Sequence, residues 1–166
     1  MAQPEFDFET AIRTLTEGGV RFIVVGGVAC AMNGAILATF DLDIVPARDP
    51  KNVKALLRVL DSLDAIYRMQ PGRRFKPGSS HLTGPGHHNL ITNCGPLDVL
   101  GAIGSGLSYH DLLPDTIEVE IDGGVRVRVL GLAKIIELKE QLGGAKDLAA
   151  LPTLRQTLKE QQRGKV

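Results

Sequence analysis

Arg21-Phe-Ile-Val-Val-Gly-Gly27 and, after a spacer of thirteen residues, Asp41-Leu-Asp-Ile-Val45 hold most of the information about how this chain folds. The first segment is β-branched and aromatic and runs into a double glycine, as a short buried strand does when it enters a turn. The second alternates polar and apolar residues, which is typical of a half-buried strand. The apolar residues 28–35 predict a buried helix between them. The sequence therefore predicts a strand, a glycine turn, a helix and a second strand in succession.

The segments on either side predict further helices and strands. Asp49-Pro50 is typical of a helix start, with aspartate as the N-cap and proline at the first helical position. Asp122-Gly123-Gly124 predicts the turn of a β-hairpin. The predicted strands are 21–25, 41–45, 89–93, 97–101, 117–121 and 125–130, with a turn at Gly95-Pro96 between the third and the fourth. The predicted helices are 9–17, 28–35, 50–63 and 132–142. A short helix is expected from Lys146, and Pro152 is expected to open a last helix that runs through Leu158. Residues 70–88 are expected to form a long loop or an irregular pair of strands.

The length predicts one domain over residues 1–166. The predicted strands and helices make it an α/β (α+β) domain, with C-terminal helices from about residue 131. Nineteen basic and nineteen acidic residues cancel, so the overall charge gives no steering toward nucleic acid. Cys30 and Cys94 are unclustered, which suits a reducing compartment better than a disulfide scaffold. The N-terminus lacks the basic and apolar regions of a secretion signal. We therefore expect a cytoplasmic protein.

Residues 22–40 form an uncharged run of nineteen residues, long enough by itself to cross a bilayer. Gly26-Gly27 and Asn33-Gly34 interrupt this run, and an aspartate follows it. A strand, a glycine turn and a buried helix explain the same residues with the turn chemistry included. We therefore predict no membrane segment.

Asp41 and Asp43 are candidate metal ligands. Because side chains alternate across a strand, the two aspartates should project to the same side about 6–7 Å apart, near enough to share or bridge a hard cation. Leu42 and Ile44 should then point into the core. The same spacing also occurs on solvated strand faces, but the glycine turn before it favours the functional interpretation.

Gly26 and Gly27 are candidate phosphate-binding residues, because backbone N–H groups at a turn and a helix N-terminus can receive phosphate oxygens. The alternative is a tight turn that needs positive φ or close helix packing. No Gly-Lys-Ser/Thr follows, which excludes a Walker loop, and the third-glycine spacing of a dinucleotide fingerprint is missing.

A hydrophobic strand, Gly26-Gly27, a spacer and then Asp41-Leu42-Asp43 together resemble the signature of the polymerase-β-like nucleotidyltransferase superfamily. The resemblance covers residues 20–158 and is nearest in style to small bacterial members that include the AbiEii and MenT-type toxins of toxin–antitoxin systems. It implies a nucleotidyltransferase-like mixed β-sheet flanked by helices. It also implies dependence on Mg²⁺ (or Mn²⁺) and transfer of an NMP from an NTP to an acceptor hydroxyl.

The family implies a third carboxylate on a later strand, and Asp98 has that place. Leu97 and Val99 are apolar and should face the core, so Asp98 should face the opposite surface together with the other two aspartates. The alternative is a solvated aspartate at a strand edge. In two-metal chemistry one cation binds the triphosphate and another activates the attacking hydroxyl. Asp98 would act mainly at this second position, as a metal ligand or a general base.

Lys139 and Lys146-Asp147 are further candidates for the nucleotide site. In the resembling toxins, a helix lysine followed by a Lys/Arg-Asp pair on the next helix closes that site, and this chain has the same order. A lysine there could neutralise the β- and γ-phosphates, and Asp147 could orient Lys139 or serve as an N-cap. A solvated helix face with an N-capping aspartate is the alternative.

The chain departs from these relatives just before Asp41. They often carry Arg-x-Thr-x-Asp, whereas this chain has Leu37-Ala-Thr39-Phe-Asp41, so Thr39 is retained and the arginine is not. Triphosphate affinity then needs a cation from elsewhere. The candidates are Arg48, Arg73, Arg74 and Lys76.

Two further clusters complete the sequence. His81, His87 and His88 have no cysteine or helix-spaced partner of a zinc pattern, so we expect a loop role. Arg73-Arg74-Phe75-Lys76 is a short basic-aromatic cluster that could touch an acceptor RNA.

The sequence as a whole favours a Mg²⁺-dependent nucleotidyltransferase with an NTP substrate and an acceptor hydroxyl on tRNA or on a protein. Membership of a toxin–antitoxin pair would add an antitoxin partner. The alternative from another class is a non-catalytic nucleotide- or partner-binding module of the same fold. Three clustered carboxylates favour catalysis, because they repel one another without cations.

Overall fold

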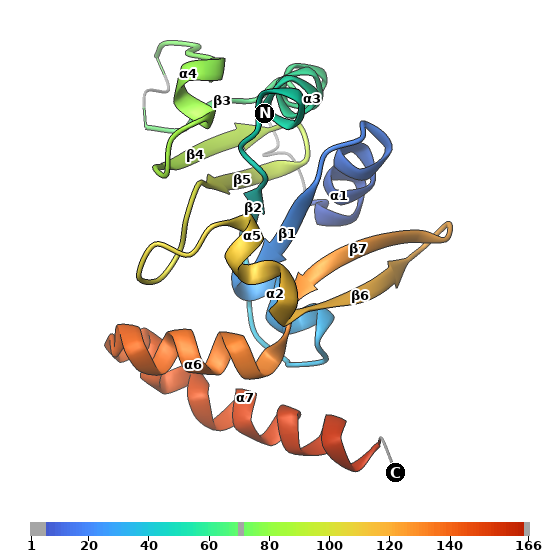
Figure 1. Ribbon diagram of the computed structural model, residues 1–166, viewed down its shortest axis with the longest axis vertical. Helices are drawn as coiled ribbons and strands as arrows, with labels where there is room; N and C mark the ends of the chain where they lie inside the picture. The colour runs from blue at the N-terminus through green and yellow to red at the C-terminus, as the bar shows by residue number, and fades with distance from the viewer. Residues whose placement is uncertain (1–5, 70–71, 165–166) are drawn as a thin grey trace.

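One mixed sheet organises the computed structural model, which describes residues 6–69 and 72–164 (Figure 1). Its strands are β1 (Phe22–Val25), β2 (Leu42–Pro46), β3 (Ile66–Tyr67), β4 (His87–Thr92), β5 (Gly95–Leu100), β6 (Thr116–Ile121) and β7 (Val125–Leu130). Across the sheet their order is β3-β4-β5-β2-β1-β7-β6. The pairs β1/β7 and β2/β5 are parallel, and the other neighbours are antiparallel.

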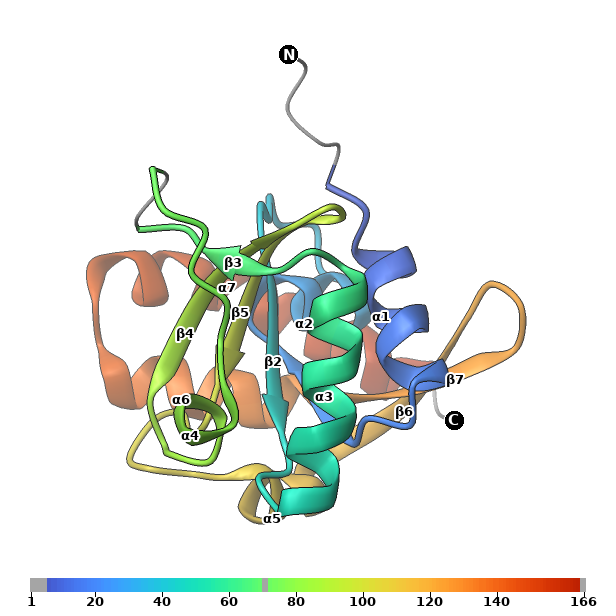
Figure 2. The same cartoon turned by 90° about the horizontal axis from the view of Figure 1, so that it is seen from above.

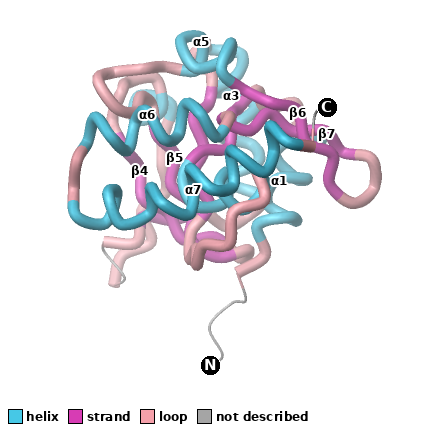
Figure 3. The backbone as a smooth tube through the Cα atoms, turned by 90° about the horizontal axis from the view of Figure 1, so that it is seen from below, coloured by secondary structure: helices cyan, strands magenta, loops and turns pink. Residues whose placement is uncertain are grey.

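Helices cover both faces of this sheet. They are α1 (Phe8–Glu17), α2 (Gly26–Met32), α3 (Pro50–Ser62), α4 (Ser79–Leu82), α5 (Tyr109–Leu112) followed by the 3-10 turn η1 (Leu113–Asp115), α6 (Leu132–Leu142) and α7 (Ala145–Arg163). α1 and α3 lie side by side over one face (Figure 2), and α6 and α7 cross the other (Figure 3). α2 contacts β1, β2 and α6, so it lies on the α6–α7 side.

Capping and buried polar contacts fix the helices of the α1–α3 layer. Asp49 caps α3, because its side chain accepts the N–H of Asn52 at 3.1 Å, and Pro50 occupies the first turn as predicted. Asn52 is buried and donates through Nδ2 to the carbonyl oxygens of Arg21 at 2.9 Å and Ala47 at 2.7 Å. These bonds tie the start of α3 to the ends of β1 and β2.

The register of the central strands sets the position of the polar side chains. β2 lies between β1 and β5, and Asp43 pairs with Val25 on one side and with Asp98 on the other. Leu42 and Leu97, which alternate with these aspartates, are almost fully buried. One face of this part of the sheet is therefore core, and the other carries the carboxylates.

The predicted fold class is confirmed: the chain folds as a mixed sheet flanked by helices. The hairpin around Asp122-Gly123-Gly124 is also confirmed, with β6 and β7 paired along their whole length. The glycine turn is part of α2, which begins at Gly26 and ends at Met32, so that helix is displaced from the predicted 28–35. Pro96, placed in a turn by the sequence, lies inside β5.

The prediction for Pro152 was wrong. We expected this proline to open a last helix, but it lies inside the single helix α7. Proline lacks the N–H that would bond to the carbonyl of Leu148. Both residues are exposed, so water can satisfy that carbonyl, and the burial of Leu151 and Leu154 on the other face keeps the helix continuous.

The structure also defines the segment expected to be irregular and the uncharged run for which a membrane span was considered and not predicted. Within 70–88, which was predicted to be a loop or a pair of strands, the structure has α4 and the beginning of β4; residues 70 and 71 lie outside the described part. Residues 22–40 form β1, α2 and a following loop. Among the described residues, no helix is both long and apolar enough to cross a membrane.

Candidate active site

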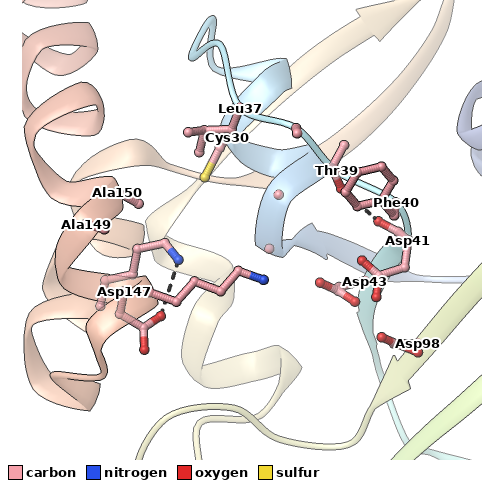
Figure 4. Close-up of a pocket in the computed structure, with 15 residues that line it drawn as sticks. Cys30, Leu37, Thr39, Phe40, Asp41, Asp43, Asp98, Asp147, Ala149 and Ala150 are labelled. Atoms are coloured by element: carbon pink, nitrogen blue, oxygen red, sulfur yellow. Dashed lines mark hydrogen bonds and ion pairs between the residues drawn. The ribbon is translucent and has the colours of Figure 1, made fainter.

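Three aspartates on or beside two adjacent strands meet on the face of the sheet that α6 and α7 cross. Asp43 in β2 and Asp98 in β5 are register partners, and Asp41 comes directly before β2. Each offers one carboxylate oxygen, and these oxygens all lie within 4.8 Å of one another. In Figure 4 the three carboxylates face the same space. The structure therefore brings together the three candidate metal ligands of the sequence.

The glycine pair lets the start of α2 approach these carboxylates. Gly26 has a φ of +68°, and a Cβ at this position would lie 2.1 Å from Oδ2 of Asp43. A Cβ at Gly27 would lie 2.8 Å from Oγ1 of Thr39. Gly26 thus needs positive φ, as the turn interpretation required, and both glycines are also needed for close packing. Because the first N–H groups of a helix have no intrahelical acceptor, those of Gly26 and Gly27 are available to an anion beside the carboxylates.

Burial and mutual repulsion raise the pKa values of two of the aspartates. Burial, followed by the charges of Asp41 and Asp98, raises the pKa of Asp43 from 3.8 to about 8. Burial and then Asp98 also raise the pKa of Asp41. The guanidinium of Arg68 opposes both shifts. Without a cation, Asp43 therefore keeps its proton up to about pH 8, and a divalent cation would displace that proton on binding.

The donor set fits a hard divalent cation. Mg²⁺ and Mn²⁺ prefer carboxylate and water oxygens, and Mg²⁺ sites typically take one or two protein carboxylates and keep several waters. The cluster offers carboxylate oxygens from Asp41, Asp43 and Asp98, and no sulfur or imidazole. Asp41 and Asp43 face the cavity, where a bound triphosphate could supply the remaining oxygens.

The opposite wall of the cavity is formed by the helices α6 and α7. Lys139, Lys146 and Asp147 line it together with the three aspartates, Gly26 and Gly27, and the cavity has a volume of about 680 Å³. Nζ of Lys139 lies 3.4 Å from Oδ1 of Asp147 (Figure 4). The N-cap of α7 is Gly144, so Asp147 holds Lys139 rather than capping the helix. Small-molecule sites commonly enclose about 300–1,000 Å³.

The loop before β2 contains the position at which this chain differs from the family that it resembles. Thr39 lines the cavity and donates through Oγ1 to the carbonyl of Asp41 at 3.1 Å. Leu37, which stands where relatives often have arginine, lines the cavity as well. The loop therefore presents an apolar side chain at this position.

Three of the four candidate substitutes for that arginine are engaged elsewhere. Arg74 pairs with Asp64 at 2.7 Å, and Lys76 pairs with Asp61 at 2.9 Å. Arg48 donates to the carbonyl of Thr83 at 3.0 Å. None of these residues, nor Arg73, is among the residues that line the cavity. The structure therefore brings none of the four candidates to the cavity, because Arg48, Arg74 and Lys76 contact residues of the α3–α4 region instead.

Sequence reasoning missed Arg68, the cation nearest the carboxylates. It follows β3 directly, and its guanidinium forms an ion pair with Oδ1 of Asp98. β3 has only two residues, so no periodic pattern marks it in the sequence. The contact depends on the pairing of β3 with β4 and of β4 with β5, which local sequence does not specify.

The histidines do not lie in a loop, contrary to expectation. His81 belongs to α4, and His87 and His88 belong to β4. Nδ1 of His81 accepts the N–H of Gly78 at 2.9 Å, and Nδ1 of His88 lies 3.0 Å from the hydroxyl of Tyr67. The ring of His81 also packs against those of Tyr67 and His88, with centroids 6.0 and 6.3 Å away, so α4 lies against the β3–β4 edge of the sheet.

Comparison with known proteins gives a structural relative. No protein-family model matches the chain, and no curated protein matches its sequence. Among solved structures, a protein from Thermotoga maritima named as a candidate nucleotidyltransferase matches with a TM-score of 0.57 and 20% identity. The match covers 92% of this chain and 91% of that one. The likeness shows that this chain has a nucleotidyltransferase-like fold.

Proposed function

We propose that this protein is a Mg²⁺-dependent nucleotidyltransferase that moves an NMP from an NTP to an acceptor hydroxyl. The observation that carries the proposal is the convergence of Asp41, Asp43 and Asp98 within 4.8 Å, facing two lysines across one cavity. The nucleotidyltransferase-like fold supports it. Nucleotidyl transfer needs both features, because the displacement develops negative charge on the pyrophosphate and requires a deprotonated acceptor oxygen.

Each side chain then has a distinct task. Asp41 and Asp43 would hold the divalent cation, which supplies a clamp for the in-line displacement and lowers the pKa of the attacking hydroxyl. The N–H groups of Gly26 and Gly27 bind phosphate oxygens, and Thr39 packs against Gly27 and so fixes the turn. Asp98 lies on the β5 side of the cluster, where it acts on the acceptor hydroxyl as a ligand or a base.

The helices α6 and α7 provide the positive charge for the triphosphate. Lys139 and Lys146 line the cavity opposite the carboxylates, and Asp147 holds Lys139 in place through the contact at 3.4 Å. A lysine is a point charge, so it suits the flexible tail of a triphosphate. Leu37 stands in the place of an arginine. Among the described residues that line the cavity, Lys139 and Lys146 therefore contribute most of the electrostatic attraction for the nucleotide.

The acceptor and the partner follow from the resemblance, and the location follows from the two unclustered cysteines. The acceptor hydroxyl belongs to tRNA or to a protein, an antitoxin controls the enzyme if it is a toxin, and the compartment is the cytoplasm. A second candidate function is a non-catalytic nucleotide-binding module. Leu37 favours this second candidate, because it removes a cation that resembling enzymes often have in front of Asp-x-Asp.

Two substitutions separate catalysis from binding. Asp98→Asn should lower kcat for label transfer from NTP to total RNA or protein by about 10²-fold or more and leave NTP affinity within a few-fold. Lys139→Ala should do the reverse, weakening NTP binding by about tenfold or more through loss of a charged contact. Affinity would be measured by calorimetry with Mg²⁺ and a non-hydrolysable NTP.

Matched controls exist on the same elements. Lys134→Ala removes a lysine from α6 that pairs with Glu137 at 3.0 Å and does not line the cavity. Asp61→Asn removes an exposed carboxylate of α3. Both controls should behave as wild type. If the wild type binds NTP but transfers label to none of the acceptors tested, the non-catalytic module is favoured. If the wild type binds neither NTP nor Mg²⁺, both functions are contradicted.

A further inference from the structure

Arg68 reaches the carboxylate cluster through the register of three strands. Its backbone N–H donates to the carbonyl of Asn89 at 3.1 Å, and Asn89 is the register partner of Asp98. Its guanidinium contacts Oδ1 of Asp98. The chain therefore places a fixed positive charge at the β5 side of the cluster.

This ion pair is shielded from water, unlike the other arginine–aspartate pairs of the described residues. Only 27% of the Arg68 side chain and 13% of the Asp98 side chain are exposed. The corresponding values are 50% and 39% for Arg21–Asp49 and 63% and 58% for Arg74–Asp64. An exposed pair contributes little, but a shielded one has strong electrostatic effects on charges within a few ångströms.

We infer that Arg68 is a resident counter-cation, which compensates the charge of Asp98 and thereby lowers the affinity of the cluster for divalent cations. The guanidinium and a cation bound by the aspartates neutralise the same negative charge, so each weakens the binding of the other. Arg68 is a positioning residue in this account, because it acts through Asp98. The inference rests on the proposed function in one respect, that the aspartates bind a divalent cation.

The consequence for the site is coupling between cation and nucleotide. A cluster with three uncompensated carboxylates would hold a divalent cation tightly without substrate, whereas one that keeps Arg68 needs the additional oxygens of the triphosphate for tight binding. The cation then arrives with the nucleotide. Arg68 thus links metal occupancy to substrate.

The test is a titration of the nucleotide-free protein with Mn²⁺, followed by calorimetry. Arg68→Met and Arg68→Gln both remove the charge and should tighten Mn²⁺ binding by about tenfold, as expected for one unit charge a few ångströms away in a partly shielded site. Arg68→Lys keeps the charge and should stay within about threefold of wild type. Loss of a merely structural contact would weaken binding instead.

Arg74→Met is the matched control, because it removes the same charge from an arginine–aspartate pair away from the cavity. It should leave Mn²⁺ affinity unchanged. If Mn²⁺ binding is unchanged or weaker in both Arg68→Met and Arg68→Gln, the inference is overturned and the proposed function stands. The same conclusion follows if Arg68→Lys behaves like Arg68→Met. If neither wild type nor any variant binds Mn²⁺, the metal requirement of the proposed function fails, and the inference fails with it.

Discussion

In the candidate site, the backbone of Gly26 lies directly against the side chain of Asp43. At this position a Cβ would overlap Oδ2 of Asp43 at 2.1 Å, so the glycine sets how near α2 and β2 can come. The backbone there is left-handed, with a φ of +68°. The consequence of a methyl group is therefore both strain and displacement of a candidate metal ligand.

Gly26→Ala should lower the free energy of unfolding by about 1–2 kcal/mol through its left-handed backbone and should also abolish the rise in melting temperature caused by Mn²⁺. Gly19→Ala is the control, because Gly19 has a φ of +78° but no atom within 4 Å of a Cβ. It should show similar destabilisation and a normal response to Mn²⁺. A Gly26→Ala protein with the wild-type response would mean that Asp43 is not a ligand.

The raised pKa of Asp43 predicts how the metal-free protein responds to pH. Its folded-state pKa is about 8 against 3.8 for the unconstrained side chain, so the folded state binds a proton that the unfolded state releases between these values. The contribution of Asp43 to stability is complete below about pH 3.8 and is lost as the pH rises through about 8.

In EDTA, the free energy of unfolding of the wild type should fall between pH 5 and about 8.5, a range that spans the raised pKa of Asp43, and Asp43→Asn should remove much of this fall. Denaturant melts at several pH values would measure both. Parallel pH profiles for wild type and Asp43→Asn would show that burial and repulsion do not perturb this carboxyl group.

Residue patterns predicted the acidic cluster but not its counter-ion. Asp41 and Asp43 share a strand period, and Asp98 lies between two apolar residues, so alternation alone could assign the face of each. Arg68 follows a strand of two residues, and its position depends on the pairing of β3 with β4. No local period encodes such a contact, so it could not be found without the tertiary structure.

At the scale of elements, α7 contains an unusual feature. Pro152 lies in the interior of this helix on its exposed side and removes one backbone hydrogen bond. Pro152→Ala should restore the donor to the carbonyl of Leu148 and raise the free energy of unfolding by about 1–3 kcal/mol. Thermal melts would measure the change, with the neighbouring exposed Thr153→Ala as control, expected to change stability by less than about 1 kcal/mol.

A destabilised Pro152→Ala protein would indicate that a kink at the proline is required for packing against α6. The sequence-based prediction put a helix start at Pro152 because proline intrinsically prefers the first turn of a helix. The buried Leu151 and Leu154 override that preference. Tertiary packing of one helix face can outweigh the loss of a solvent-side hydrogen bond.

Local sequence motifs predicted the individual strands and helices better than they predicted which strands pair in the sheet. Asp122-Gly123-Gly124 specifies its own hairpin, because the turn and both strands are adjacent in the chain. The parallel pairs join distant segments, as Ile23 with Arg128 does, and no motif in either strand identifies its partner. The mixed sheet was implied only by the resemblance to a known family, and the strand order came from the structure.

At the scale of the whole molecule, the candidate site lies between the sheet with α2 on one side and the helices α6 and α7 on the other. The carboxylates and glycines belong to the sheet and α2, while the lysines belong to α6 and α7 on the opposite wall of the cavity. The tip of the β6–β7 hairpin projects from the sheet (Figure 1), and no residue of the hairpin lines the cavity. A nucleotide that binds both walls would therefore connect α2 with the α6–α7 pair and leave the hairpin untouched.

Hydrogen exchange can detect that connection. With Mg²⁺ and a non-hydrolysable NTP, amides of residues 26–32 and of residues 139–150 should both exchange more slowly, because opening either wall would then require release of the ligand. Amides at the tip of the hairpin, residues 119–127, should be unchanged and serve as the internal control. Asp43→Asn should abolish protection on both walls, since the cation and the phosphates bind as one unit. Protection confined to residues 139–150 would mean that the lysines bind the nucleotide without the carboxylates, and the proposed transfer reaction would lose its geometric basis.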